Sequence, residues 1–382
     1  MNYEALKAHL ARMQADMVRA LQSLVERESP SDDKPRLDAL AHFLQGRFGA
    51  LGAEATVLPQ VETGDQLRVV FPRQSGSWAA PPALLLCHMD TVWPAGTLAL
   101  RPFRVEEGRA YGPGAYDMKA GIVAAEFALR AVTELGLRLP RPVLLLVNAD
   151  EEIGSGDSRL LIEELARRSQ YVFVLEPPLA SGALKTARKG VGRFVVEIVG
   201  RAAHAGVEPE KGISAVLELA HQIVSLQGLA DAGQGTTINV GVVHGGTRSN
   251  VVAAHAEAQV DVRVWSMAEA ARVAAAIKGL EPQGTGIQLR VRGGFGRPPM
   301  ERTTASTVLF RRAQEIGRYL GLDLAEASTG GGSDANFTAA LGIPTLDGLG
   351  VAGDGGHADH EHVLVESLPE RAALLAALLV NL

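Results

Sequence analysis

The chain has 382 residues, of which 47% are hydrophobic and 21% are charged, as in ordinary soluble globular proteins. Its formal net charge is -6, and no basic tract interleaved with aromatic residues occurs, which argues against a nucleic-acid partner. The single cysteine excludes an internal disulfide, and the longest apolar run, 372–380, is far shorter than the ~18 residues that span a bilayer. We therefore expect a cytoplasmic protein of two or three domains without a membrane segment.

The first half of the chain alternates helix and strand patterns. Segment 1–29 has the charge and apolar spacing of an amphipathic helix. Three short apolar runs suit strands buried on both faces of a sheet: 83–87, 143–147 and 171–175. A helical stretch at 120–135 separates the first two, and helices at 306–320 and 368–379 resume the pattern near the C-terminus. This order predicts an α/β fold with a mostly parallel sheet and flanking helices.

The middle of the chain follows a different pattern, β-α-β-β-α-β. The expected strands are 192–199, 236–243, 251–265 and 287–291. One expected helix, 212–226, places an apolar stripe on one side: Ile213, Val216, Leu217, Ala220, Ile223 and Val224. Ser266 and Glu269 form a capping box for the other helix, which runs to about 280. We expect an inserted α+β ferredoxin-like domain at 188–296, between the two parts of a catalytic domain at 1–187 and 297–382.

Potential metal ligands follow the predicted strands. Asp117 opens the helical stretch between the first two predicted strands, and the other five candidates follow a predicted strand. The six candidates are His88, Asp90, Asp117, Glu151, Glu152 and Glu176. Each alone has an ordinary structural explanation, such as a helix N-cap for Asp117. Open α/β sheets, however, bind ligands at the carboxyl ends of their strands, so the joint pattern predicts a metal site there. Near the C-terminus, His357, His360 and His362 offer one further ligand, which spacing alone does not select.

Seven ordered segments resemble a known enzyme family: HMDTV, YGPGAYDMK, DEEIGS, LEP, RAAHAG, GGGSDA and the late GGH. They are similar to those of the dizinc aminoacylase and glutamate carboxypeptidase family, which includes acetylornithine deacetylase and succinyl-diaminopimelate desuccinylase. The resemblance runs from about residue 21 to the C-terminus. Segments 83–176 and 329–365 look most like the bacterial folate-cleaving glutamate carboxypeptidases.

The resemblance implies a role for each residue of the site. Five residues would bind two zinc ions per subunit: His88 and Glu176 one, Glu152 and His357 the other, with Asp117 bridging both. The peptide bond after Asp117 would be cis. Glu151 would be the general base that deprotonates the attacking metal-bound water, and Asp90 would orient His88. His204 would stabilise the oxyanion, in dimeric members from the partner subunit.

The metal ions would also explain the run of three acidic residues at 150–152, because dications relieve the repulsion between neighbouring carboxylates. Asp150 is expected to be structural. Manganese and cobalt also suit carboxylate-rich ligands, so the residues do not fix the metal. The resemblance implies a homodimer formed through the inserted domain.

The expected substrate is a small N-acyl amino acid or peptide, from which a C-terminal amino acid, glutamate in the first interpretation, is released. Four residues are expected on the substrate side: Asn250, Arg263, Arg297 and Ser333. An aminoacylase or deacetylase of the acetylornithine type is the alternative, because Met118 stands where the folate-cleaving enzymes tend to have a second Asp. A non-catalytic metal-binding relative is disfavoured, since the general base and all five ligand positions are filled.

Overall fold

The computed structural model describes residues 1–72 and 80–382, which form two compact units. The first unit comprises Met1–Thr186, Arg302–Ser328 and Ser333–Leu382, and the second comprises Ala187–Glu301 and Thr329–Gly332. The range expected for the insertion, 188–296, lies inside the second unit. Within the described part of the chain, no helix has the length and apolar character needed to cross a membrane.

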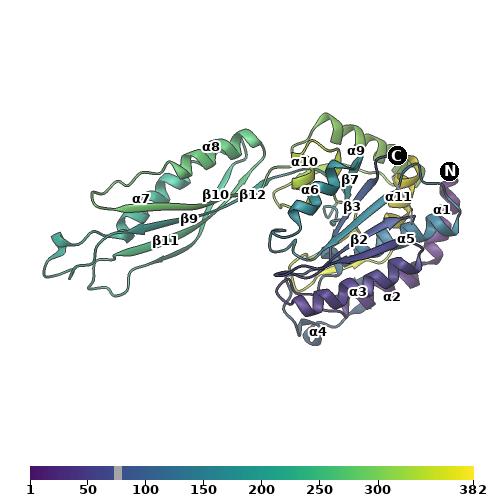
Figure 1. The fold of residues 1–382 in the computed structure, drawn as a ribbon, viewed down its shortest axis with the longest axis horizontal. Coiled ribbons are helices and arrows are strands. Elements are labelled where there is room, and N and C mark those ends of the chain that lie inside the picture. The colour runs from purple at the N-terminus through teal and green to yellow at the C-terminus, as the bar shows by residue number, and fades with distance from the viewer. Residues whose placement is uncertain (73–79) are drawn as a thin grey trace. The chain divides into compact units, whose positions relative to one another are not determined.

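A six-stranded sheet forms the centre of the first unit (Figure 1). Its strands, in spatial order, are β1 (Glu54–Leu58), β2 (Gln66–Phe71), β6 (Val143–Asn148), β3 (Ala83–His88), β7 (Tyr171–Val174) and β14 (Thr345–Leu346). The last four run parallel to one another, and β2 is antiparallel to both of its neighbours. Strands β3, β6 and β7 are buried along their whole length, as their continuous apolar sequences predict.

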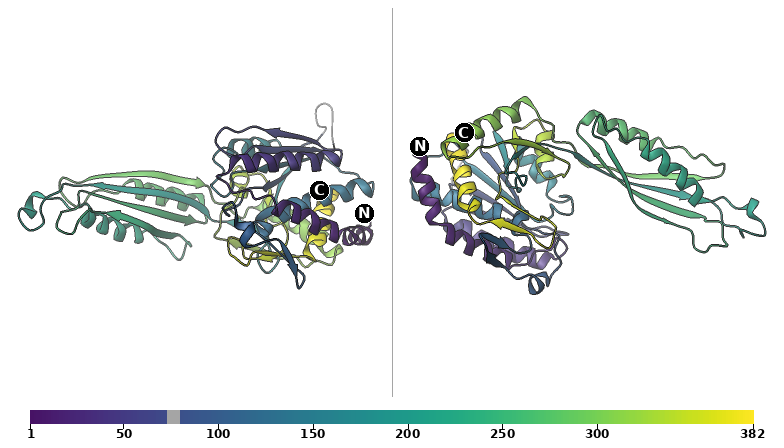
Figure 2. Two further views of the ribbon diagram at one scale, coloured as in Figure 1. Left: turned by 90° about the horizontal axis from the view of Figure 1, so that it is seen from below. Right: turned by 180° about the vertical axis from the view of Figure 1, so that it is seen from behind.

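Helices cover both faces of this sheet (Figures 1 and 2). The unit contains α1 (Tyr3–Arg12), α2 (Gln14–Val25), α3 (Lys34–Ala50), α4 (Thr97–Leu100), α5 (Ala120–Glu134), α6 (Arg159–Arg167), α9 (Thr304–Tyr319), α10 (Ala335–Ala340) and α11 (Ser367–Asn381). On one face, Leu85, Leu145 and Phe173 join a core with apolar residues of α2, α5 and α11. The expected α/β architecture is confirmed. The prediction of a single N-terminal helix is wrong, since the chain leaves helical geometry at Met13, between α1 and α2.

Smaller sheets complete the first unit and its connections. One four-stranded sheet has the order β15 (Gly353–Asp354), β16 (His362–Leu364), β5 (Arg109–Tyr111) and β4 (Arg104–Glu106). A two-stranded sheet pairs β8 (Leu184–Arg188) with β13 (Glu326–Thr329). The β5–β16 ladder pairs Tyr111 with His362, and so joins the segment before Asp117 to the segment after His357.

The second unit is an antiparallel four-stranded sheet with two helices. Its elements are β9 (Gly190–Val199), α7 (Ala215–Gln227), β10 (Thr237–Gly245), β11 (His255–Val264), α8 (Met267–Lys278) and β12 (Gln288–Arg297). The strand order β10-β11-β9-β12 is that of the ferredoxin-like fold, which confirms the expected class. The Ser266 hydroxyl accepts the N–H of Glu269 at 3.2 Å and caps α8.

The apolar stripe predicted on one side of the helix that is α7 lies largely on the outside of this unit. Val216, Leu217 and Val224 are 44%, 60% and 74% exposed, whereas Leu219 and Leu226 are buried against the sheet. The buried face of α7 is therefore a different one, which includes Leu219 and Leu226. An apolar helix face left exposed needs a different explanation from core packing.

Candidate metal centre

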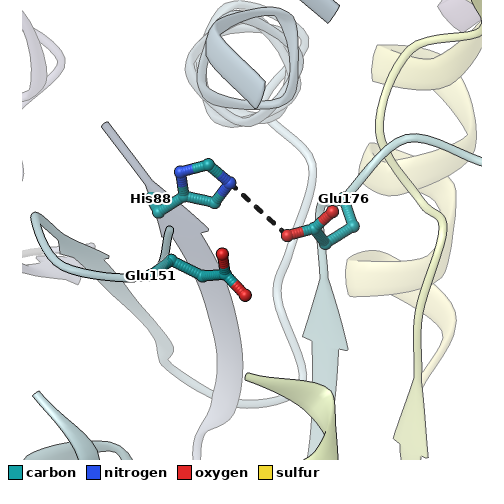
Figure 3. A group of neighbouring side chains, drawn as sticks. All are labelled: His88, Glu151 and Glu176. Carbon is teal, nitrogen blue, oxygen red and sulfur yellow. Dashed lines mark ion pairs between the residues drawn. The ribbon is translucent and has the colours of Figure 1, made fainter. Parts of the chain in front are cut away.

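The parallel strands bring the predicted ligands to one edge of the sheet. His88 is the last residue of β3 and pairs with Asn148, the last residue of β6. Glu151 and Glu152 follow β6 after two residues, and Glu176 follows β7 after one. Figure 3 shows His88, Glu151 and Glu176 converging from these three chain segments. Their ligand atoms all lie within 4.8 Å of one another.

Asp117 lies between two imidazole rings. Its Oδ1 is 3.2 Å from His88 Nε2, and its Oδ2 is 3.2 Å from His357 Nε2. Glu176 Oε1 lies 3.5 Å from His88 Nε2, and Glu152 Oε2 lies 3.2 Å from His357 Nε2. Each imidazole therefore has one carboxylate of its own and shares Asp117 with the other. The peptide bond between Asp117 and Met118 is cis, as the resemblance implied.

The electrostatics of the site favour positive charge. Hydrogen bonds to Asp117 and Glu152 raise the pKa of His357 to about 10. Burial by itself would lower the pKa of His88, but the carboxylates of Asp117, Asp90 and Glu176 outweigh it and raise that pKa well above the usual value. Burial likewise opposes ionisation of Asp117, yet the two imidazoles hold its pKa below the usual range. Protonated imidazoles thus offset the negative charge of the carboxylates, a role that bound metal cations could also fill.

Asp90 contacts both halves of the site. His88 Nδ1 lies 3.0 Å from the Asp90 backbone oxygen and 3.4 Å from its Oδ1. In the neutral ring that a metal ion requires, a proton donated from Nδ1 to this backbone oxygen leaves the lone pair on Nε2, the nitrogen that faces Asp117 and Glu176. Asp90 Oδ1 also accepts the N–H of Glu151 at 3.2 Å, and Oδ2 accepts the N–H of Glu152 at 3.1 Å. One buried carboxylate therefore positions one imidazole and the two adjacent glutamates.

Hydrogen bonds of Ser31 and Asp150 also fix these segments; the Ser31 contact was not predicted, whereas a structural role was expected for Asp150. The Ser31 hydroxyl donates to Asp90 Oδ2 at 2.8 Å, so a segment from before α3 completes the hydrogen bonding of this carboxylate. Asp150 is fully buried, and its Oδ2 accepts the N–H groups of Asp157 and Ser158 at 2.9 and 3.1 Å. Asp150 thereby closes the loop that carries Glu151 and Glu152, which is a structural role. The spacing of Asp150 to Ser158, in an Asp- and Gly-rich loop, is the only sequence signal for it.

Four of the expected site residues lie in the second unit, among them Arg297, which the predicted boundary had assigned to the catalytic domain. His204 and Asn250 lie close together. Ala205 donates its N–H to the Asn250 backbone oxygen at 3.0 Å, and His204 forms an isolated antiparallel β-bridge with Val251. His204 and Asn250 are both exposed. Arg263 lies on β11, where its guanidinium donates two hydrogen bonds to Asp261 at 2.7 and 3.0 Å, and Arg297 is buried at the end of β12.

Ser333 does not line an open pocket in this structure, contrary to expectation. Its side chain has no exposed surface, and its hydroxyl donates to Asp347 at 2.9 Å. The neighbouring Asp334 is also buried and accepts from Asn148 at 2.7 Å. The polar side chains of the GGGSDA segment therefore form hydrogen bonds inside the protein, and Asp334 connects the segment to the end of β6.

The donor set fits divalent metal ions. Imidazole nitrogen and carboxylate oxygen are ligands that zinc takes in catalytic sites, where a position stays open for water or substrate. Two imidazoles on opposite oxygens of one buried aspartate provide two adjoining sites with a shared ligand. Without cations, this concentration of carboxylates would be repulsive. The residues present would hold two ions as His88 with Glu176 and His357 with Glu152, sharing Asp117.

Comparison with known proteins agrees with this geometry. Residues 84–381 match the model of the peptidase family M20/M25/M40. The chain belongs to this family. Carboxypeptidase G2 of Pseudomonas sp. (strain RS-16) is 32% identical over 382 aligned residues, which cover 97% of this chain and 90% of that protein. Acetylornithine deacetylase of Proteus mirabilis (strain HI4320) is 30% identical over 242 residues, covering 59% and 60% of the two chains.

A solved M20-type structure has the same overall fold. The crystal structure of aminopeptidase PepT from Bacillus cereus ATCC 10987 aligns with a TM-score of 0.81 and 25% identity, covering 96% of this chain and 98% of that one. Metal-dependent hydrolysis of an amide bond is thus the chemistry of this M20 chain. The resemblance drawn from the seven sequence segments is confirmed at the level of the family.

Proposed function

We propose that this M20 hydrolase holds two zinc ions per subunit and releases a C-terminal glutamate from an N-acyl or peptidyl substrate. The observation that carries the proposal is the placement of His88 and His357 on the two oxygens of Asp117. Glu176 and Glu152 each complete one side of this arrangement. When bound, the ions would supply the positive charge that polarises the scissile carbonyl and lowers the pKa of water.

Glu151 is the residue proposed to move the proton. Its carboxylate oxygen lies within 4.8 Å of the ligand atoms of His88 and Glu176. Asp90 holds the Glu151 backbone, so the carboxylate is presented toward the site without being one of the five ligands. Glu151 would take the proton from the attacking water and give it to the leaving amine.

His204 is proposed as the donor for the oxyanion. Its Nδ1 accepts the N–H of Gly206 at 3.1 Å, so the neutral ring carries its proton on Nε2. Nε2 can therefore donate to a developing negative charge, which is the role that oxyanion stabilisation requires. We propose that this donation occurs across subunits of a homodimer.

The surface of the second unit supports the homodimer. β10 is an edge strand with exposed Val242 and Val243, and α7 packs beside it with Val216, Leu217 and Val224 exposed. An apolar helix face next to an unpaired strand edge is a surface that a second copy can cover, with β10 pairing to β10 about a twofold axis. Val224→Asp should shift the chain to a monomer in analytical ultracentrifugation and leave the metal content unchanged. A dimer that persists would refute this surface.

Glutamate is proposed as the released residue because segments 83–176 and 329–365 resemble those of the glutamate carboxypeptidases. The similarity to carboxypeptidase G2 over almost the whole chain supports a carboxypeptidase. Arg263, Arg297 and Asn250 are the candidates for the substrate side. Asp261 already accepts hydrogen bonds from Nε and Nη2 of Arg263, so a substrate carboxylate would either displace Asp261 or use the remaining N–H donors of the guanidinium. The similarity to acetylornithine deacetylase and the presence of Met118 favour, as the second candidate, an aminoacylase for another amino acid.

The test is a rate comparison across N-acyl amino acids that share one acyl group and differ only in the C-terminal residue. With zinc supplied, a preference for glutamate supports the first proposal, and a preference for a basic or apolar residue supports the aminoacylase. Absence of turnover for every member, despite two bound metals, would refute both.

The catalytic roles are tested by two variants. Glu151→Gln should keep both metals and lose most turnover, and His204→Ala should lose turnover at unchanged metal content. A mixed dimer of one subunit of each variant should recover about one working site if His204 acts on the partner. A fully active Glu151→Gln would refute its assignment as the base, and a mixed dimer without activity would refute action across subunits.

A further inference from the structure

Glu361 is a buried carboxylate that collects four N–H donors. Its Oε1 accepts the backbone N–H groups of Tyr116 and Asp117 at 3.0 and 3.1 Å. Its Oε2 accepts the backbone N–H of Gly114 at 2.9 Å and the indole N–H of Trp93 at 2.7 Å. The side chain is 2% exposed, so water cannot replace these bonds if the acceptor is removed.

Three of the four donors belong to the segment that carries the shared ligand. Gly114 has a φ of 71°, in the left-handed region that favours glycine, and this turn points the N–H groups of the segment at one acceptor. The N–H of Asp117 itself is one of the three. The position of the Asp117 carboxylate between His88 and His357 therefore depends on an anchor outside the ligand set.

Glu361 also belongs to the segment that carries His357. It follows that ligand by four residues, and β16 begins directly after it, where His362 pairs with Tyr111 of β5. A backbone contact of 3.4 Å, from the Gly112 N–H to the Glu361 oxygen, continues the ladder. Glu361 thus connects the loop that carries Asp117 with the loop that carries His357. The His357 side chain is 51% exposed, so packing restrains it only weakly.

We propose that Glu361 is a positioning residue that sets the affinity for both metal ions by fixing Asp117 relative to His357. The inference rests on the proposed two-metal site. It assigns no contact between Glu361 and a metal or a substrate, and it acts through backbone N–H groups. Residues that orient metal ligands in this way typically change metal affinity 10–100-fold when they are replaced.

The experiment measures zinc affinity by competition with a chelating dye in the full-length chain and in Glu361→Gln. The amide can accept at one atom only, so two of the four donors lose their acceptor, and its own NH₂ group opposes them. We expect both dissociation constants to rise 10–100-fold, with KM nearly unchanged at saturating zinc. Unchanged zinc affinity in a folded Glu361→Gln would overturn the proposal.

Glu126→Gln is the matched control. Glu126 is also a buried carboxylate of the first unit, but it accepts two hydrogen bonds from the Arg47 guanidinium, both at 2.7 Å, instead of backbone N–H groups of the Asp117 segment. A loss of thermal stability without a change in zinc affinity is expected for it. If Glu126→Gln weakened zinc binding as much as Glu361→Gln does, general destabilisation would explain the effect and the proposal would fail.

A second variant covers the case in which Glu361→Gln does not fold. Glu361→Asp keeps both acceptors and the charge but shortens the side chain by one methylene, so a three- to tenfold weaker zinc affinity is expected, and no change would overturn the proposal. The unaltered chain must first bind two zinc ions. If it binds one or none, the proposed function fails, whereas two sites insensitive to Glu361 would refute this inference alone.

Discussion

Lys119 offers a sharp test of the energetics around the site. It is fully enclosed, and its ammonium group donates to the backbone oxygens of Leu24 and Arg27 at 3.1 and 2.9 Å, at the C-terminal end of α2. Burial lowers the pKa of Lys119 from the ordinary 10.5 to about 7. We predict that Lys119→Met removes a pH dependence of stability that the unaltered chain shows.

The sign follows from which state binds the proton. Between pH values near 7 and 10.5 the unfolded chain keeps Lys119 protonated, while the folded chain holds it neutral. The unfolded state then binds more protons, so the free energy of unfolding rises with pH. From about pH 7 to about pH 9 this single group should raise it by roughly 2 kcal/mol. Below about pH 7 the penalty for burying the charge is fully present.

The assay is urea unfolding of chelator-treated protein at these two pH values. The free energy of the unaltered chain relative to Lys119→Met should rise by roughly 2 kcal/mol across this range. Lys34→Met is the control, because hydrogen bonds to Asp65 and Asp38 outweigh burial and raise the pKa of Lys34, which moves its titration above this range. A difference between the unaltered chain and Lys119→Met that does not change with pH would refute the reasoning.

Three further predictions concern charged groups of the first unit. Asp90→Asn replaces one of the two acceptor oxygens with an NH₂ donor at a fully buried position, so one of the two backbone N–H groups loses its acceptor. We expect kcat to fall 10–100-fold in steady-state assays, and a loss below threefold would contradict the role of Asp90. Arg47→Met should lower the free energy of unfolding by ~3–5 kcal/mol in urea, because Glu126 is left unpaired, and the additional change Glu126→Met should restore most of that loss. A double variant as unstable as the single one would argue against a stabilising ion pair. Loading zinc near pH 7 should release about two protons, since the pKa of His88 and that of His357 are both raised. Calorimetry in buffers of different ionisation enthalpy counts the protons, and a release below one proton would contradict the assignment of charged imidazoles.

The sequence was most informative where local pattern and topology determine position. Short apolar runs predict parallel buried strands, and parallel strands end at one edge, so the convergence of His88, Glu152 and Glu176 could be anticipated without coordinates. The pairing of Arg263 with Asp261 was also within reach, because residues two apart on a strand share a face, although it was not predicted.

Other features depend on contacts that no local pattern reports. The periodicity of α7 defines an apolar face but does not say whether that face meets its own sheet or remains exposed. The role of Glu361 depends on where the backbone N–H groups of a segment 245 residues away point, and side-chain spacing carries no information on that. The hydroxyl of Ser31 reaches Asp90 only because the chain before α3 lies along the end of β3.

Most of the second unit is one chain segment, Ala187–Glu301, and a pair of hydrogen bonds joins the chain near its two ends. Arg188 and Met300 exchange both backbone N–H···O bonds at 3.0 Å, so the chain leaves and returns at almost the same point. A loop closed in this way adds little entropy cost to folding of the surrounding unit, since closure cost grows only slowly with loop length. The segment between them is therefore a replaceable cassette: a short turn in its place should let the metal-binding unit fold, and cassettes of different surface could give the same hydrolytic centre new assemblies and new substrates.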